Sequence, residues 1–279
     1  MKRALALACL AGTSCILDSN ESGSGAHLMV TWQLASLATN TTAPCPAGFD
    51  TAAVYSQPVD DTGANAGDPT IDLFDCSSGY GLTSPIDIDE IQTYVETVSI
   101  ATDDNSSVYG QTVPMLVTIG DTVQEVDTLP IYVDGGHFEI TWQLVGAAGS
   151  GSGSDEGSGS GSDDGSGSGS GSGSDEGSGS GSGSDILSCA EIPTAQSIGL
   201  TAMGSDGHTY VAQPLLCDAQ PGYTDGIPDG TYTVTLSLLD GNGSALGTSQ
   251  PIASTIATSP TIGNPIVQLP QLAIDVSAP

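Results

Sequence analysis

His27-Leu-Met-Val-Thr-Trp-Gln-Leu34 and His137-Phe-Glu-Ile-Thr-Trp-Gln-Leu144 are two copies of one eight-residue strand pattern. The distance from Trp32 to Trp142 is 110 residues, which is the length of one small β domain. A strand that recurs at the spacing of a whole domain indicates an internal duplication. We therefore expect the chain to fold as two related β domains.

Four further features follow each copy in the same order. A first cysteine is followed by a β-patterned segment and a second cysteine, with a sequence separation of 31 from Cys45 to Cys76 and of 28 from Cys189 to Cys217. The other matched features are a Thr-Tyr pair that opens an alternating strand (93–94 and 231–232), an Asp/Asn/Gly/Ser turn (103–107 and 240–244) and a last apolar strand (129–133 and 272–276). The order predicts domains at 26–134 and 135–279, joined directly at about 133–137.

The strands themselves are recognisable from their alternation. Tyr232-Thr-Val-Thr-Leu-Ser-Leu238 alternates in character, and Asp-Gly, Asn-Gly and Pro-Asp-Gly steps separate such runs. Helical periodicity is absent beyond the N-terminal apolar stretch. Short strands with a turn signal every 8–12 residues are typical of sandwiches. We predict an all-β protein with two antiparallel β-sandwich domains.

Residues 149–184 consist of 15 Gly, 15 Ser and six acids. Such a composition cannot bury a core and favours a flexible coil. The first tryptophan and cysteine of the repeat are 13 residues apart in copy one and 47 apart in copy two. The difference between these two separations nearly equals the length of the tract. We therefore predict a disordered Gly/Ser/acidic insertion at 149–185 inside the second domain, where a long loop adds little closure entropy.

The charge is extreme, with Lys+Arg 2 against Asp+Glu 33 and a formal net charge of −31. Both cations, Lys2 and Arg3, lie at the N-terminus. Nucleic-acid binding needs Lys or Arg to neutralise phosphates, and phosphoryl transfer needs a Walker lysine or an arginine finger. The sequence therefore excludes nucleic acid as a partner.

Residues 1–15 resemble a secretory signal. Lys2 and Arg3 precede a nine-residue apolar stretch, and small residues lead to Cys15. Small residues followed by cysteine resemble the lipobox of bacterial lipoproteins, although Gly12 stands where that pattern prefers Leu. We predict lipidation of Cys15, a tether at 16–25, and export to a bacterial outer membrane or cell surface with the lipid as the only membrane contact. The alternative is ordinary cleavage and a secreted soluble protein.

Four cysteines remain after the signal: Cys45, Cys76, Cys189 and Cys217. Four cysteines allow three pairings, and the repeat selects Cys45–Cys76 and Cys189–Cys217. Export to an oxidising compartment favours disulfides, and no C-x-x-C indicates a zinc or redox site.

The candidate catalytic and binding residues are few. The only histidines are His27, His137 and His208, and the first two occupy equivalent repeat positions, which favours a structural role. Trp32 and Trp142 are expected in the cores against the disulfides rather than on sugar-binding surfaces. Tyr94 and Tyr232 are expected as core or corner residues. Tyr80, Tyr109 and Tyr223 lie near turns and are candidates for an exposed binding face.

The acidic clusters offer oxygen ligands for Ca²⁺ at 60–61, 103–105 and 240–242. None fits the EF-hand spacing, so the sequence predicts weak cation binding and solvated turns, with no dedicated metal site, cofactor or catalytic residue.

The order of tryptophan strand, cysteine, strand, cysteine and then Pro228-Asp-Gly-Thr-Tyr-Thr-Val-Thr-Leu-Ser-Leu-Leu-Asp-Gly-Asn-Gly-Ser-Ala-Leu-Gly247 resembles a known family. It is similar to the Ig-like or prealbumin-like repeats of exported myxobacterial lipoproteins, of the carboxypeptidase-regulatory type. The first domain departs from this pattern at 87–93, so its membership rests on the internal repeat. The resemblance implies an envelope-anchored β-sandwich protein and carries over no catalytic residues.

These features predict a non-enzymatic cell-envelope lipoprotein with a structural or adhesive role. Two alternatives stay open: a carbohydrate-binding module for a polysaccharide, and an enzyme accessory protein at the cell surface. An envelope protein is the other possible partner. The repeated Ser-Gly pairs beside acids also resemble glycosaminoglycan attachment regions, which xylose on the tract serines would reveal.

Overall fold

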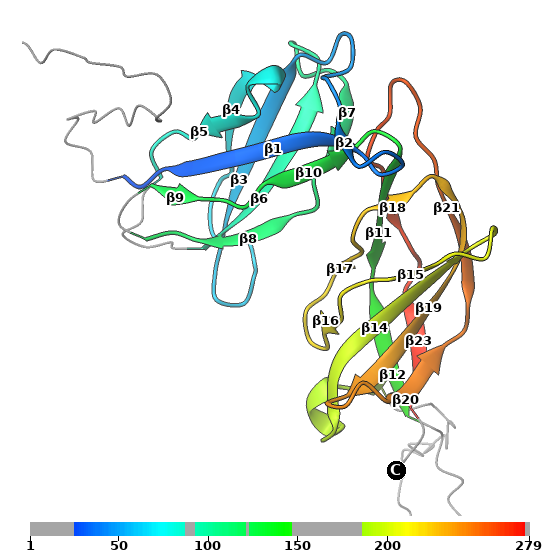
Figure 1. The fold of residues 1–279 in the computed structure, drawn as a ribbon. Helices are drawn as coiled ribbons and strands as arrows, with labels where there is room; N and C mark the ends of the chain where they lie inside the picture. Colours follow the sequence, from blue (N-terminus) through cyan, green and yellow to red (C-terminus); the bar gives the residue numbers. More distant parts are fainter. Residues whose placement is uncertain (1–24, 87–92, 121–122, 147–185, 277–279) are drawn as a thin grey trace, which may run out of the picture.

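The computed structural model describes residues 25–86, 93–120, 123–146 and 186–276, and these residues form an all-β fold (Figure 1). Their buried apolar side chains gather into two separate cores. One core runs from Ala26 to Ile131 in sequence and the other from Phe138 to Val276. We call the two bodies the N-terminal and C-terminal sandwiches. The predicted signal, Cys15 and most of the tether lie outside the described residues, as does the Gly-Ser tract.

The N-terminal sandwich has two sheets. In the first, the long central strand β1 (Leu28–Ser36) pairs with four shorter strands: β2 (Thr41–Thr42), β5 (Tyr80–Leu82), β9 (Gln124–Glu125) and β10 (Leu129–Tyr132). The second sheet has the order β4-β3-β6-β7, with β8 also on β6: β3 (Thr51–Val59), β4 (Thr70–Asp75), β6 (Thr93–Ala101), β7 (Val108–Gln111) and β8 (Met115–Thr118).

The C-terminal sandwich repeats this plan with its first strand divided at Thr141 into β11 (Gly135–Ile140) and β12 (Trp142–Gly146). β11 pairs with β17 (Gly222–Tyr223), β18 (Ile227–Pro228) and β22 (Ile266–Gln268). The larger sheet has the order β13-β12-β23-β20-β19-β14-β15, with β16 on β14 and β21 on β19. Its other bounds are β13 (Ile186–Leu187), β14 (Ala195–Gly204), β15 (Thr209–Val211), β16 (Leu215–Leu216), β19 (Gly230–Asp240), β20 (Ala245–Ser249), β21 (Ile252–Ile256) and β23 (Leu272–Val276).

Alternation explains why these segments form two-faced sheets. On β19 the side chains of Tyr232, Val234, Leu236 and Leu238 are buried, while the threonines between them face outward. Successive side chains on a strand point to opposite sides, so one apolar face per sheet closes the core. The predicted all-β sandwich fold is confirmed. Most pairings are antiparallel, and the exceptions join the first strand of each sandwich to late strands, as in β1 with β10 and β12 with β23.

The internal repeat is preserved in atomic detail. The Nδ1 atom of His27 lies 2.7 Å from the carbonyl oxygen of Thr83, and Nδ1 of His137 lies 2.7 Å from that of Thr224. The hydroxyl oxygens of the same two threonines accept from the backbone N–H of Leu28 and of Phe138. Equivalent residues therefore tie the first strand to the same loop in both sandwiches.

β12 and β13 are antiparallel neighbours, with Leu144 opposite Leu187 and Val145 opposite Ile186. Residues 147–185 connect these two strands and lie outside the described residues. The domain boundaries and the disordered insertion stay predictions. Within the described ranges, no helix has the length and apolar character needed to cross a membrane.

Candidate functional site

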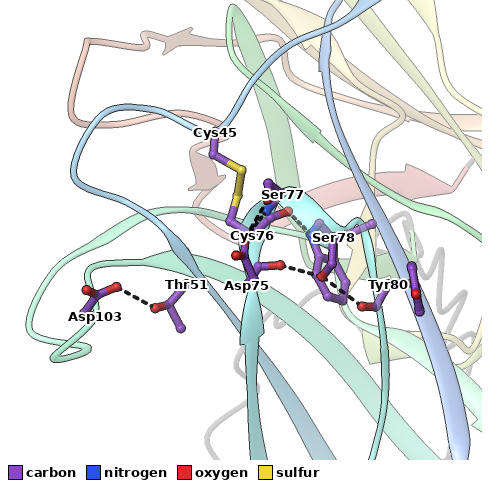
Figure 2. Close-up of a disulfide and its surroundings, with 9 residues drawn as sticks. Cys45, Thr51, Asp75, Cys76, Ser77, Ser78, Tyr80 and Asp103 are labelled. Carbon is purple, nitrogen blue, oxygen red and sulfur yellow. Dashed lines mark hydrogen bonds between the residues drawn. A yellow bond between two sulfur atoms is a disulfide. The ribbon is translucent and has the colours of Figure 1, made fainter.

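The two disulfides have the pairing that the repeat predicted. Cys45 is bonded to Cys76 with a Cα–Cα distance of 6.2 Å, and Cys189 to Cys217 with 6.0 Å. Figure 2 shows the first bond at the short 3₁₀ turn η1 (Cys76–Ser78), which the side chain of Asp75 caps by accepting from the Ser77 N–H. Closing loops of this length stabilises each sandwich by roughly 3–4 kcal/mol in the chain-entropy model.

The two tryptophans lie in the cores, as expected. Trp32 is 3% exposed and Trp142 is 2% exposed. Each indole Nε1–H donates to the carbonyl oxygen of a disulfide cysteine, Cys76 at 3.0 Å and Cys217 at 3.1 Å. A buried indole keeps a polar handle that must find an acceptor, and the disulfide supplies one at a fixed place. These side chains stabilise the fold and cannot stack on a ligand.

Small cavities lie beside both disulfides. One in the C-terminal sandwich has a volume of about 360 Å³ and is lined by Trp142, Leu187, Gln220 and the Cys189–Cys217 bond among others, and a second of about 480 Å³ is lined by the same bond and Leu216. The cavity in the N-terminal sandwich has about 250 Å³ beside Trp32. Among the described residues, Asp218 is the only titratable side chain that lines these cavities. The described lining therefore brings together no acid and base pair of the kind that hydrolysis requires.

The histidines occupy structural positions. His27 and His137 each bond a backbone carbonyl, and His208 is exposed at a turn. Burial is the largest influence on His137 and lowers its pKa, although the Thr224 carbonyl and the Asp225 carboxylate partly offset it. A general base must also reach the proton of a nucleophile. In both strand histidines, Nδ1 is instead hydrogen-bonded to a main-chain carbonyl oxygen.

The acids of the turns accept hydrogen bonds from nearby backbone and hydroxyl groups. Asp104 accepts hydrogen bonds from the hydroxyls of Thr102 and Ser106 and from the Ser106 N–H, which together lower its pKa to about 2. Asp60 and Asp240 accept from two backbone N–H groups each, and hydrogen bonds lower the pKa of both. Among the described residues, no three His, Cys, Asp or Glu side chains gather as a metal site requires. Weak Ca²⁺ binding stays a prediction.

The tyrosines divide between core and surface. Tyr94 and Tyr232 are buried, at 6% and 4% exposure, as expected. Of the three candidates for a binding face, Tyr80 is 61% exposed and Tyr223 is half-buried. The expectation for Tyr109 was wrong. It is 5% exposed because β7 brings its ring against Phe49 at 5.5 Å, inside the N-terminal core.

An exposed apolar face covers the second sheet of the N-terminal sandwich. Ile71 is 54% exposed, Leu73 56% and Leu116 65%. The strand register places Ile71 opposite Tyr55 and Val95 opposite Leu116, so these side chains are neighbours on the outer side of β4-β3-β6-β8. We call these five residues the aliphatic face. None of its positions is charged, in a chain with 33 acids.

The equivalent outer surface of the C-terminal sandwich carries threonine hydroxyls beside apolar side chains, since Val211, which pairs with Thr201, is 71% exposed and Met203 is 50% exposed. Thr201 lies opposite Thr235, and Met203 lies between Thr233 and Thr209 on neighbouring strands. We call these four threonines and Met203 the hydroxyl face. It is also uncharged. Exposed apolar side chains that are neighbours mark candidate contact surfaces more often than scattered single residues do.

Glu96 is a buried residue that the sequence analysis missed. Its side chain points into the N-terminal core at 0% exposure, and Oε2 accepts a 2.8 Å hydrogen bond from the hydroxyl of Ser56. Its other oxygen, Oε1, has no hydrogen-bond partner among the described residues. Burial raises the pKa of Glu96 to about 7, the Ser56 bond opposes that rise, and the charge of Asp72 adds to it. The internal repeat could have revealed this inward position. Glu96 aligns with the buried Val234, and its strand partner Ser56 aligns with Ala202.

Comparison with known proteins finds only distant structural likeness. No protein family and no curated protein matches the chain. Solved structures similar to it include the pilus adhesin SpaC of Lactobacillus rhamnosus GG in its open conformation, with 11% identity and a TM-score of 0.20 over 89% of this chain. Another is a Bacteroides ovatus protein whose suggested role is cell adhesion, with 7% identity and a TM-score of 0.25, covering 92% of this chain and 97% of that one.

The chain spans 31% of the length of the SpaC structure. Likeness at these TM-scores carries no argument about ligands or partners. The assignment to the myxobacterial lipoprotein type therefore stays a prediction from the sequence.

Proposed function

We propose that this protein is a non-enzymatic adhesive or structural protein of the bacterial cell surface, which contacts its partner through the aliphatic face. The single observation that carries this proposal is the distribution of charge and apolar surface. The aliphatic face exposes more than half of Ile71, Leu73 and Leu116 to solvent while carrying no acid. In a chain with 33 acids, an exposed apolar surface without a carboxylate is consistent with a contact surface.

The architecture supports a role outside the cell. Two disulfides resist unfolding in an oxidising compartment, where no cytosolic reductant acts. Tightly bonded turns such as the one at Asp104 protect the strand ends without any Lys or Arg. An adhesive or structural role needs only exposed sheet surfaces, which such sandwiches provide, and no catalytic centre.

Acidic substitutions test the contact surface. We expect Leu73→Asp with Leu116→Asp to abolish sedimentation of the purified protein with isolated cell envelopes, because two carboxylates must then be desolvated in the contact. Ile186→Asp is the matched control, since Ile186 is 71% exposed and lies outside the face. Near-UV circular dichroism checks that each variant is folded. Equal sedimentation of both variants with wild type would rule out this surface.

The lipid anchor is tested separately. We expect the mature protein to begin at a lipidated Cys15 and to contain no trypsin site even after denaturation, because Lys2 and Arg3 are the only cationic residues that trypsin recognises. Mass spectrometry of the mature N-terminus and a trypsin digest provide the measurement. An unmodified N-terminal residue other than Cys15, or tryptic cleavage of the mature chain, would contradict the anchor.

A second candidate function is binding of a neutral polysaccharide, favoured by the hydroxyl face. Thr201, Thr233 and Thr235 combine hydroxyls with methyl groups on a flat sheet, and none of them is charged. The chain has no cation for an anionic sugar in the described residues. Retention of a neutral glycan on an array, lost in Thr233→Asp but kept in Leu73→Asp, would favour this function over the first.

A further inference from the structure

Most asparagines of this chain begin an Asn-x-Ser/Thr motif, in which x is not proline. The chain has six asparagines, and four of them stand in such a motif: Asn20, Asn40, Asn105 and Asn242. In exported proteins this motif is the acceptor for N-linked sugars. Asn20 lies outside the described residues, and the other three can be placed in the fold.

The two asparagines outside the motif belong to the fold itself. Asn264 is 1% exposed, its backbone N–H donates to the carbonyl oxygen of Tyr132 at 2.8 Å, and its Oδ1 accepts from the Tyr132 N–H at 3.2 Å. These bonds join a segment of the C-terminal sandwich to β10 of the N-terminal one. Asn65 pairs with Val59 in an isolated β-bridge. A sugar on Asn264 would break its bonds, so the motif is missing where the fold could not accept a glycan.

The three described motifs lie on exposed turns at the ends of strands. Asn40 is between β1 and β2, Asn105 is between β6 and β7, and Asn242 is between β19 and β20. All three side chains are exposed. Within the described residues, the side-chain amides of Asn40 and Asn105 form no hydrogen bond, and the amide of Asn242 bonds the carboxylate of Asp240.

The hydroxyl residues of the same motifs are exposed as well. They are Thr42, Ser107 and Ser244. A glycan is bulky and hydrophilic, and on these turns it displaces no core side chain. Both sandwiches therefore accommodate a sugar at these places without a change in packing.

The backbone of the β19–β20 hairpin does not require an asparagine. In the β6–β7 hairpin, Asn105 has a φ of 54° and donates its N–H to the Thr102 carbonyl at 2.8 Å. The equivalent place in the β19–β20 hairpin is taken by Gly243, which has a φ of 80° and donates to the Asp240 carbonyl at 3.0 Å. Asparagine tolerates left-handed backbone, which accounts for Asn105. Asn242 precedes that place, so the left-handed turn residue does not explain it.

An aspartate stands two positions before the acceptor in both hairpins. Asp103 precedes Asn105, and Asp240 precedes Asn242, whereas Asn40 lacks such an acid. The pattern Asp-x-Asn-x-Ser therefore recurs in equivalent hairpins of the two sandwiches. A carboxylate at a fixed distance from the acceptor offers a cationic group of a transferase a charge-assisted hydrogen bond.

A shared role in the turn does not explain this spacing. Asp240 holds its own hairpin by accepting from two backbone N–H groups, whereas Asp104 does so in the first hairpin. Asp103 is exposed, and its carboxylate accepts a 3.1 Å hydrogen bond from the Thr51 hydroxyl instead (Figure 2). The two aspartates thus differ in local role and share their distance to the acceptor.

We propose that Asn105 and Asn242 are the acceptors of N-linked glycans, which a transferase of the exporting membrane attaches from a lipid-diphosphate sugar. The side-chain amide nitrogen attacks C1 of the sugar, and an N–C1 bond forms. The C1–O bond to the diphosphate breaks, the lipid diphosphate leaves with that electron pair, and a base of the transferase takes the amide proton. The modification requires export of the chain and does not depend on the adhesive contact of the aliphatic face.

Mass spectrometry of the protein purified from its native cell envelope tests the proposal. Proteases that cleave at Asp and Glu place the acceptors on separate peptides, because acids stand between them in the sequence. We expect a sugar mass on the peptides of Asn105 and Asn242, assigned to the asparagine by fragmentation, and none on the peptide of Asn40. Unmodified Asn105 and Asn242 in the native protein would overturn the proposal.

Variants expressed in the native host separate transfer by the motif from other additions. Ser107→Ala keeps the acceptor and removes the hydroxyl of the motif, so it should lose the sugar at Asn105 and keep it at Asn242. Ser106→Ala is the matched control, because it removes a hydroxyl from the same turn and leaves the motif intact. A sugar that persists on Asn105 in Ser107→Ala would overturn the proposal.

The aspartate is tested in the same way. Asp103→Asn removes the carboxylate two positions before the acceptor and leaves the motif intact, so the sugar at Asn105 should be lost while that at Asn242 is kept. A sugar on Asn40 of the wild type, or on Asn105 of Asp103→Asn, would overturn the choice of acceptors by the aspartate.

Discussion

Trp142→Ala is expected to destabilise the C-terminal sandwich by about 3–5 kcal/mol, which is the range for deleting a large buried aromatic side chain. The indole is 2% exposed and packs in the C-terminal core against the Cys189–Cys217 region. The variant loses apolar burial, leaves a cavity, and orphans the Cys217 carbonyl that accepted the Nε1–H. Far-UV circular dichroism during guanidinium unfolding measures the change.

The repeat provides an internal control for this experiment. Trp32 is then the only tryptophan, and its fluorescence reports the N-terminal sandwich, whose unfolding midpoint should change little. Trp142→Phe keeps an aromatic ring but removes the donor, so it should cost less than the alanine variant. If Trp142→Ala lowers the free energy of unfolding by less than about 1 kcal/mol, the indole contributes no more to stability than a surface side chain. That result would contradict its assigned place in the core.

Glu96→Gln is expected to stabilise the N-terminal sandwich at pH 8 by up to about 3 kcal/mol, given 1.36 kcal/mol for each unit between the usual and the raised value. Burial raises the pKa of Glu96 to about 7 from 4.5. The folded state therefore holds the proton over a pH range in which the unfolded state has lost it. In the wild type, the contribution of protonated Glu96 to stability is complete below pH 4.5 and is lost as the pH rises to about 7. The Gln variant keeps a neutral side chain at every pH.

The difference between variant and wild type should accordingly vanish near pH 4 and reach its maximum above pH 7. Chemical unfolding followed by Trp32 fluorescence at pH 4, 6 and 8 measures it. The double variant Ser56→Ala with Glu96→Val recreates the Ala202–Val234 pair found at the same register in the other sandwich, and should also be stabilised at pH 8. Glu125→Gln removes an exposed carboxylate and is the matched control. A pH-independent difference for Glu96→Gln would contradict the assignment.

Much of the fold could be predicted because the sequence contains its own comparison. Two copies of the tryptophan strand gave the sandwich, the pairing of four cysteines and the burial of Trp32 and Trp142. The same comparison contained the signal for Glu96, since alignment with Val234 places it on an inward position. Tyr109 illustrates the opposite case. It lies near a turn in sequence, but the inward direction of its ring depends on how β7 crosses the core.

The candidate surfaces depended on register as well as on alternation. Alternation indicates which side chains leave the core, but Ile71 and Tyr55, or Val95 and Leu116, become neighbours only through strand pairing. A shift of one residue would turn each of these side chains to the other face. The aliphatic and hydroxyl faces are therefore properties of the assembled sheets.

The sequence by itself determined the strand pattern, the duplication and the disulfide pairing, because each depends on local alternation or the internal repeat. The tertiary structure alone decided the contact between Asn264 and Tyr132. These residues are 132 positions apart, and neither has a distinctive local pattern. Their hydrogen bonds and the burial of His137 arise only when segments of the two sandwiches meet. Long-range polar pairing follows from the packing of whole sheets, which no short stretch of sequence encodes.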